Sequence, residues 1–181
     1  TVGPEVGIVQ PNAPSNVKEV MENGDKILAD MITDSDKCFE NGAIMAAWPE
    51  TMVLTSLNKS YVKLCVPDSR PVKYDKQISE HARGKGYVLV GASGVEVEVD
   101  NFNYKVKDRY NIACLYLPDG SQQDEYYSKI HLVPFGEYIP FKDTWFYNLV
   151  LKLSPYDYDY NLTRGTDYTI FEIEDNKSKY K

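Results

Sequence analysis

The sequence predicts a layered α/β domain, in which helices cover a largely buried sheet. Two short apolar runs, residues 6–9 and 43–48, have the length and composition of buried strands. Between them, apolar residues recur at helical spacing over residues 17–36, which predicts a helix with one buried face. A strand, a covering helix and a second buried strand make a βαβ unit, whose strands pair in parallel.

The later elements follow from apolar runs and turn residues. Residues 51–72 predict a loop with a short helix, and residues 75–85 predict a helix that ends at the glycines 84 and 86. Four further strands are expected, at 87–92, 95–99, 110–117 and 123–129, with a Pro-Asp-Gly turn at 118–120 before the last. The remaining elements are a loop at 131–141, an apolar helix at 144–153, a strand at 168–173 and a polar turn at 176–181.

Composition excludes several classes of protein. The net charge of −7 and the pI near 4.9 argue against a nucleic-acid binder, which needs a basic surface for phosphates. Hydrophobic residues make up 43% of the 181 residues, so a mainly disordered chain is not expected. No apolar run is long enough to span a bilayer.

The three cysteines and two histidines do not predict a metal site or a disulfide scaffold. A structural zinc site needs four ligands from this small pool, and the sequence has no CxxC pair. Three cysteines at long spacing are also too few for a disulfide framework. We expect Cys38, Cys65 and Cys114 to be small buried hydrophobic residues.

Glu50 is the first candidate for chemistry. It follows Trp48 and Pro49 at the carboxyl end of a predicted strand, where ligand sites of α/β sheets gather. A carboxylate in this place could serve as a general base. The alternative is a loop acid that caps a following helix, and the residues alone leave both open.

Lys129 and Glu137 flank a second candidate region. Lys129 ends a predicted strand, where an exposed lysine commonly guards a sheet edge. Glu137 lies in a loop that two prolines and a glycine stiffen, which suits a functional carboxylate as well as a solvated turn residue. Between them, His131 could be an acid or base, but we expect a histidine packed under the loop.

Four stretches together resemble one family. They are VGIVQPN at 6–12, AWPET at 47–51, LVGA at 89–92 and YYSKIHLVPFGEYIP at 126–140. Their order and approximate spacing are similar to the nitrilase-like domain of bacterial apolipoprotein N-acyltransferases, a branch of the carbon–nitrogen hydrolase (nitrilase) superfamily. The last stretch is the most specific to this branch. Asn111-Ile112-Ala113 also resembles an Asn-Ser-Ala element of the family, with Ile in place of Ser.

The resemblance implies an α-β-β-α sandwich fold and a Glu–Lys–Cys triad in one partial domain over residues 1–181. Matched motif by motif, Glu50 falls on the triad glutamate, Lys129 on the triad lysine and Glu137 on an assisting glutamate. The triad cysteine follows the lysine in the family, whereas no cysteine follows Lys129 here. We therefore expect a domain cut short at its C-terminal end, before the catalytic cysteine, and a chain that is inactive alone.

The implied reaction moves an acyl chain from phospholipid to the cysteine as a thioester, then to the α-amine of a diacylglyceryl-cysteine lipoprotein. The expected partners are therefore a phospholipid donor, a diacylated lipoprotein acceptor and the membrane surface, at the periplasmic face of the bacterial inner membrane. No metal or organic cofactor is implied. Residues 144–153 are either an arm that dips into the bilayer surface or an ordinary core helix.

Two other functions stay open. One is a soluble carbon–nitrogen hydrolase that cleaves a small amide or nitrile. The other is a non-catalytic relative that lost the cysteine. Retention of both Glu50 and Lys129 argues against the second, because an unused buried ion pair is costly to keep.

Overall fold

A six-stranded sheet organises the protein, seen in a computed structural model that describes residues 3–11, 23–100, 103–140, 161–175 and 178–180. Its strand order is β1-β2-β4-β5-β6, with β3 also paired to β4. The strands are β1 Val6–Ile8, β2 Met45–Ala47, β3 Val53–Ser56, β4 Tyr87–Asp100, β5 Asn103–Tyr116 and β6 Gln122–Ser128. The helices are α2 Gly24–Glu40, α3 Lys59–Val62 and α4 Arg70–Ala82. A separate pair consists of β7 Ile173–Glu174 and β8 Lys179–Tyr180.

The predicted βαβ unit is present. β1 pairs in parallel with β2, and β2 in parallel with β4, so the chain crosses over through α2. Ile27, Leu28 and Met31 place an apolar stripe of α2 against the sheet, where each is 5% exposed or less. α2 begins at Gly24, and residues 17–22 of the expected helix lie outside the described residues.

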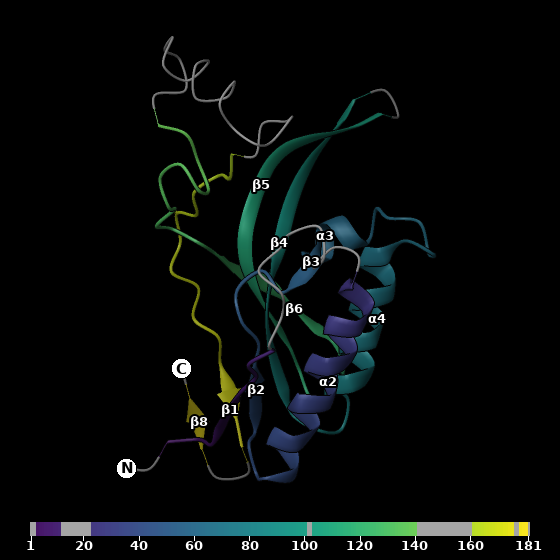
Figure 1. Cartoon of the computed structure of the whole chain (residues 1–181), viewed down its shortest axis with the longest axis vertical. Helices are drawn as coiled ribbons and strands as arrows, with labels where there is room; N and C mark the ends of the chain where they lie inside the picture. Colours follow the sequence, from purple (N-terminus) through teal and green to yellow (C-terminus); the bar gives the residue numbers. More distant parts are fainter. Residues whose placement is uncertain (1–2, 12–22, 101–102, 141–160, 176–177, 181) are drawn as a thin grey trace.

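The two faces of the sheet are covered differently. Helices α2 and α4 lie on one face, and residues 161–174 run along the other (Figure 1). The larger apolar core lies between the helices and the sheet, where Leu28, Met31, Ile78 and Val90 are all fully buried or nearly so. Edge strand β1 is more exposed than the sequence predicts, and its Ile8 is 80% exposed. The reason is that helices cover only one of its faces.

Several element boundaries differ from the predictions. β3 forms where a loop was expected, because Val53 finds a free stretch of the β4 edge to pair with. The expected strands 87–92 and 95–99 are one strand, since Gly91 and Gly94 continue the extended backbone instead of ending it. The late strand is only Ile173–Glu174, and it pairs with β8 where a polar turn was expected. The expected helix 144–153 lies outside the described residues.

Candidate active site

A break between two strands places Glu50. Strand β2 pairs with the Tyr87–Leu89 end of β4, and β3 pairs with Ala92 and Ser93 further along the same edge. The connecting turn must therefore cross β4 near Gly91. A Cβ atom at Gly91 would collide with the carbonyl oxygen of Pro49 and lie 2.8 Å from the Cα of Glu50. The missing side chain lets the turn rest on the sheet and fixes where Glu50 leaves the backbone.

The next residue in this turn is strained. Thr51 has a φ of 56°, in the left-handed region that β-branched residues rarely adopt. Its hydroxyl donates to the side-chain oxygen of Asn111 on β5, over 3.4 Å. The amide nitrogen of Asn111 donates in turn to Oε1 of Glu50. Strain of this kind persists where the surroundings hold it, and it is frequent at functional sites.

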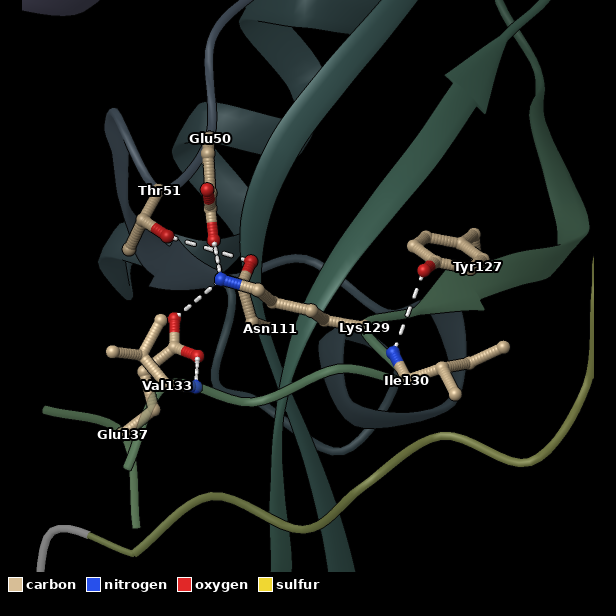
Figure 2. Close-up of polar contacts among 8 residues, drawn as sticks. All are labelled: Glu50, Thr51, Asn111, Tyr127, Lys129, Ile130, Val133 and Glu137. Carbon is tan, nitrogen blue, oxygen red and sulfur yellow. Dashed lines mark hydrogen bonds and ion pairs between the residues drawn. The ribbon is translucent and has the colours of Figure 1, made fainter. Parts of the chain in front are cut away.

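Lys129 joins two carboxylates that are distant in the sequence. It follows the last residue of β6, and its backbone N–H donates to the carbonyl of Asn111 over 2.8 Å. Its Nζ lies 2.7 Å from Oε1 of Glu50 and 2.7 Å from Oε1 of Glu137 (Figure 2). Glu50 is 79 residues away in the chain, so the fold alone brings this pair together.

The loop that carries Glu137 is held from two sides. Oε2 of Glu137 accepts a hydrogen bond of 2.8 Å from the backbone N–H of Val133, inside the loop (Figure 2). The carbonyl of Glu137 accepts from the N–H of Leu162 over 2.8 Å. The carbonyl of Lys129 accepts from the N–H of Gly165 over 3.0 Å. Residues 162–165 therefore clamp both ends of the loop onto the sheet.

Both ends of the Lys129–Glu137 contact have shifted pKa values. Hydrogen bonds to Glu137 and then to Glu50 raise the pKa of the Lys129 ammonium, against a smaller lowering by burial. Burial raises the pKa of Glu137, but the hydrogen bonds from Lys129 and the Val133 N–H together outweigh it, so the pKa is lowered. The side chains of Lys129 and Glu137 are 24% and 18% exposed, whereas that of Glu50 is 57% exposed. The pair is thus ionised at neutral pH, and Glu50 faces open space.

A cavity of about 340 Å³ lies beside these groups. It is lined by Leu89 and Ala113, whose neighbours along the strands belong to the helix-side core, so it lies mainly on the sheet face away from α2 and α4. Its walls are mainly apolar or aromatic, and Glu50, Asn111 and Lys129 supply the charged and amide groups. The lining residues are Trp48, Glu50, Leu89, Gly91, Asn111, Ile112, Ala113, Tyr127 and Lys129. A small polar cluster in an apolar hollow is typical of sites for small molecules.

No cysteine lines this cavity. Cys114 packs into the core between the sheet and the helices, with Tyr116, whereas its neighbour Ala113 lines the cavity on the opposite face. Burial raises the pKa of the Cys114 thiol to about 12, with a smaller contribution from Asp75. Cys38 and Cys65 are partly exposed, so only Cys114 matches the expected burial.

The structure brings together all three predicted site residues and adds three more. Glu50, Lys129 and Glu137 form one ion-pair cluster. His131 is exposed, so the expectation of a packed histidine is wrong. Sequence reasoning missed the supporting roles of Gly91, Thr51 and Asn111. The Asn111-Ile112-Ala113 element was the only signal for any of them.

The described residues contain neither a candidate metal site nor a candidate membrane-spanning helix. No cluster of His, Cys, Asp or Glu with metal-binding geometry occurs among them. No helix within the described ranges is both long enough and apolar enough to cross a bilayer.

Solved structures with a similar fold identify the architecture. An amidase from Nesterenkonia matches 99% of this chain over 55% of its own, with 14% identity and a TM-score of 0.51. NitN amidase from Nesterenkonia sp. AN1 matches 98% over 55%, with 12% identity and a TM-score of 0.50. The chain has a nitrilase-like α/β fold. The predicted fold class is thereby confirmed, and the described residues supply a helix-covered sheet of this nitrilase-like fold.

Curated relatives of the nitrilase-like chain are acyltransferases. Apolipoprotein N-acyltransferase 2 of Treponema denticola is 43% identical over 77 residues, which cover 40% of this chain and 14% of that protein. Apolipoprotein N-acyltransferase 1 of Treponema pallidum is 26% identical over 133 residues, 71% of this chain and 23% of that protein. The chain thus spans less than a quarter of either relative. No family model matches it. The similar proteins, acyltransferases and amidases alike, are enzymes.

Proposed function

We propose that this chain is the glutamate- and lysine-bearing part of an apolipoprotein N-acyltransferase. The whole enzyme would move an acyl chain from phospholipid, through a cysteine thioester, to the α-amine of a diacylglyceryl-cysteine lipoprotein. The observation that carries the proposal is the Lys129 ammonium, which bridges Glu50 and Glu137 beside an apolar cavity. The likeness to the two Treponema acyltransferases supports acyl transfer over amide hydrolysis.

One of the three N–H donors of the Lys129 ammonium is available to a substrate. An ammonium carries three N–H donors, and two of them point at Glu50 and Glu137. Among the described residues, the third has no acceptor, so it can receive the oxyanion that forms when a thiolate attacks an ester carbonyl. Such a donor is worth roughly 3–4 kcal/mol of transition-state stabilisation in a water-poor site.

Glu50 is suited to move the protons. Its Oε1 accepts from both Lys129 and Asn111, which leaves Oε2 without a donor among the described residues. In the proposed first step, Oε2 takes the proton of the thiol, the sulfur bonds to the ester carbon, and the carbon–oxygen bond breaks. The proton then passes to the departing lysophospholipid oxygen, which leaves a thioester.

The second step reverses these roles. The lipoprotein α-amine attacks the thioester carbon, Glu50 takes the amine proton, and the carbon–sulfur bond breaks. The proton returns to the sulfur, so the products are an amide and the original thiol. We propose that the thiol comes from a segment outside these 181 residues, because none of the three cysteines lines the cavity.

The proposal is tested with the full-length protein that contains this chain. The assay supplies a phospholipid donor and a synthetic diacylated lipopeptide, and mass spectrometry detects the triacylated product and the acylated enzyme. We expect Lys129→Met to reduce turnover by about 10²–10³-fold, because one oxyanion donor is lost. The matched control is Lys85→Met, which removes an ion pair with Asp36 on the helix side of the sheet and should keep full turnover.

Each negative result in this assay would lead to a different conclusion. Hydrolysis of small amides without acyl transfer would replace the proposal with a carbon–nitrogen hydrolase. Full turnover in Lys129→Met would remove Lys129 from the chemistry. For the purified 181-residue chain, we predict no acyl labelling, and stoichiometric labelling would contradict an external thiol. A location at the inner membrane belongs to the same proposal, since both proposed substrates carry acyl chains, and its periplasmic face is the one that the family resemblance implies.

A further inference from the structure

We infer that Asn111 is a positioning residue that sets the orientation of the Glu50 carboxylate by clamping the Glu50–Thr51 turn onto β5. The inference rests on the proposed function, because it gives Asn111 a purpose within the same acyl-transfer site. It adds a residue that acts by holding its neighbours in the site in place, first among them the Glu50 carboxylate.

Asn111 uses both ends of its side-chain amide on the same turn. Its nitrogen donates to Oε1 of Glu50, and its oxygen accepts from the Thr51 hydroxyl over 3.4 Å. Its backbone carbonyl accepts from the Lys129 N–H over 2.8 Å. Asn111 is 8% exposed and lies within the long β4–β5 pairing, opposite Ser93. One rigid residue therefore contacts the base, the strained turn and the lysine backbone.

Lys129 alone would not orient Glu50. An ammonium is a compact charge on a flexible stem, so it attracts a carboxylate without fixing the plane of that group. The Glu50 side chain is 57% exposed, which leaves it room to rotate toward solvent. The planar amide of Asn111 supplies a second, directional contact to the same oxygen, Oε1. Together the two donors turn Oε2 outward as the oxygen that is open to a thiol or an amine.

The backbone supports the same interpretation. Thr51 holds a φ of 56°, which a β-branched residue adopts only where neighbours enforce it. Gly91 presses on this turn from β4, and Asn111 holds it from β5. Without the Asn111 contacts, the remaining described link from this turn toward β5 and β6 is the ion pair between the flexible Lys129 side chain and Glu50.

The kinetic test uses the full-length protein and two substitutions of Asn111. Asn111→Ala should lower kcat by about 10²-fold with KM unchanged, because a misplacement of about 1 Å costs this much. Asn111→Asp puts a carboxylate against Glu50, so at pH 8 its kcat should be at least as low as that of Asn111→Ala. Its activity relative to wild type should rise as the pH falls to 6, because the carboxyl pair takes up a proton and then donates the missing hydrogen bond.

Asn58→Ala is the matched control, because it removes another buried asparagine without touching the site. Asn58 is 1% exposed, and its side chain bonds both the N–H and the carbonyl of Val95. It should lower the thermal midpoint while kcat per folded molecule stays at the wild-type value. A flat pH ratio for Asn111→Asp, or an equal kcat loss in Asn58→Ala, would overturn the positioning role.

A second measurement does not depend on activity. In urea unfolding of the full-length protein, Asn111→Ala and Glu50→Ala should shift the midpoint by less together than the sum of their separate shifts, because each removes the same contact. Asn111→Ala and Asn58→Ala should add. Additive shifts for the first pair would overturn the inference even in an active acyltransferase. Coupled shifts in a protein without acyl transfer would overturn only the proposed function.

Discussion

Gly91→Ala should disable the site by moving the backbone of Glu50, although it removes none of the charged groups of the site. The new Cβ would collide with the carbonyl oxygen of Pro49 and lie 2.8 Å from the Cα of Glu50, against an ordinary contact of 3.4 Å or more. Relief therefore requires the Glu50 Cα to move by about 0.6 Å, and the Pro49 carbonyl by more. Both obstacles are backbone atoms, so no side-chain rotation removes the clash.

The expected magnitudes follow from that displacement. A shift approaching 1 Å at a catalytic group lowers the rate by about 10²-fold. Overpacking at a buried position costs about 1–3 kcal/mol of unfolding free energy. The rate is measured as acyl transfer by the full-length protein, and the stability by urea unfolding. Gly136→Ala is the control in the neighbouring loop, because its Cβ would meet nothing closer than 3.5 Å.

Three results would refute this reasoning. Gly91→Ala with wild-type turnover would mean that the turn does not depend on the missing Cβ. Equal losses in Gly91→Ala and Gly136→Ala would mean that any added methyl group near the site is harmful, whatever it contacts. A crystal structure of Gly91→Ala with an unmoved Pro49 carbonyl would refute the steric argument directly.

The remaining predictions concern pH and thiol reactivity. Although burial raises the pKa of Glu137, its hydrogen bonds from Lys129 and Val133 lower it overall, so the stability it contributes is present above pH 4.5 and lost as the pH falls through the folded-state value. Glu137→Gln should therefore flatten the acid limb of stability, measured by urea unfolding between pH 5 and pH 3; an unchanged slope would contradict the linkage. Cys114 should resist iodoacetamide at pH 8 in the folded chain while partly exposed Cys38 and Cys65 react, because burial raises its thiol pKa to about 12. Mass mapping of the labelled peptides checks this, and early labelling of Cys114 would contradict its placement.

The fold was predictable from the sequence where local periodicity determines it. The apolar spacing of Ile27, Leu28 and Met31 predicts the buried face of α2 without knowledge of its neighbours. Strand β3 was not predictable in this way, because Thr55 and Ser56 carry no strand pattern of their own. It forms because β2 leaves part of the β4 edge unpaired. An unpaired stretch of a strand edge is a property of the assembled sheet, so the local sequence does not predict it.

The same distinction applies to the candidate site, where some residues are predictable from the local sequence and others are not. Glu50, Lys129 and Glu137 were located by motifs, since each stands in a short recognisable stretch. Gly91 and Thr51 could not be found so, because their importance depends on β2 and β3 sharing one edge of β4. A glycine within an apolar run predicts only a weak strand. The strand register is needed to show that the backbone of another segment packs against it.

The two carboxylates around Lys129 are not interchangeable, and their surroundings decide which one can move protons. Glu137 is 18% exposed, both its oxygens accept hydrogen bonds, and its pKa is lowered, so it is a weak base with no oxygen free for substrate. Glu50 is 57% exposed, and among the described residues only its Oε1 is hydrogen-bonded. A general base needs an accessible oxygen within reach of the proton that it takes. Glu137 therefore fits the task of holding Lys129 charged and in place, which leaves proton transfer to Glu50.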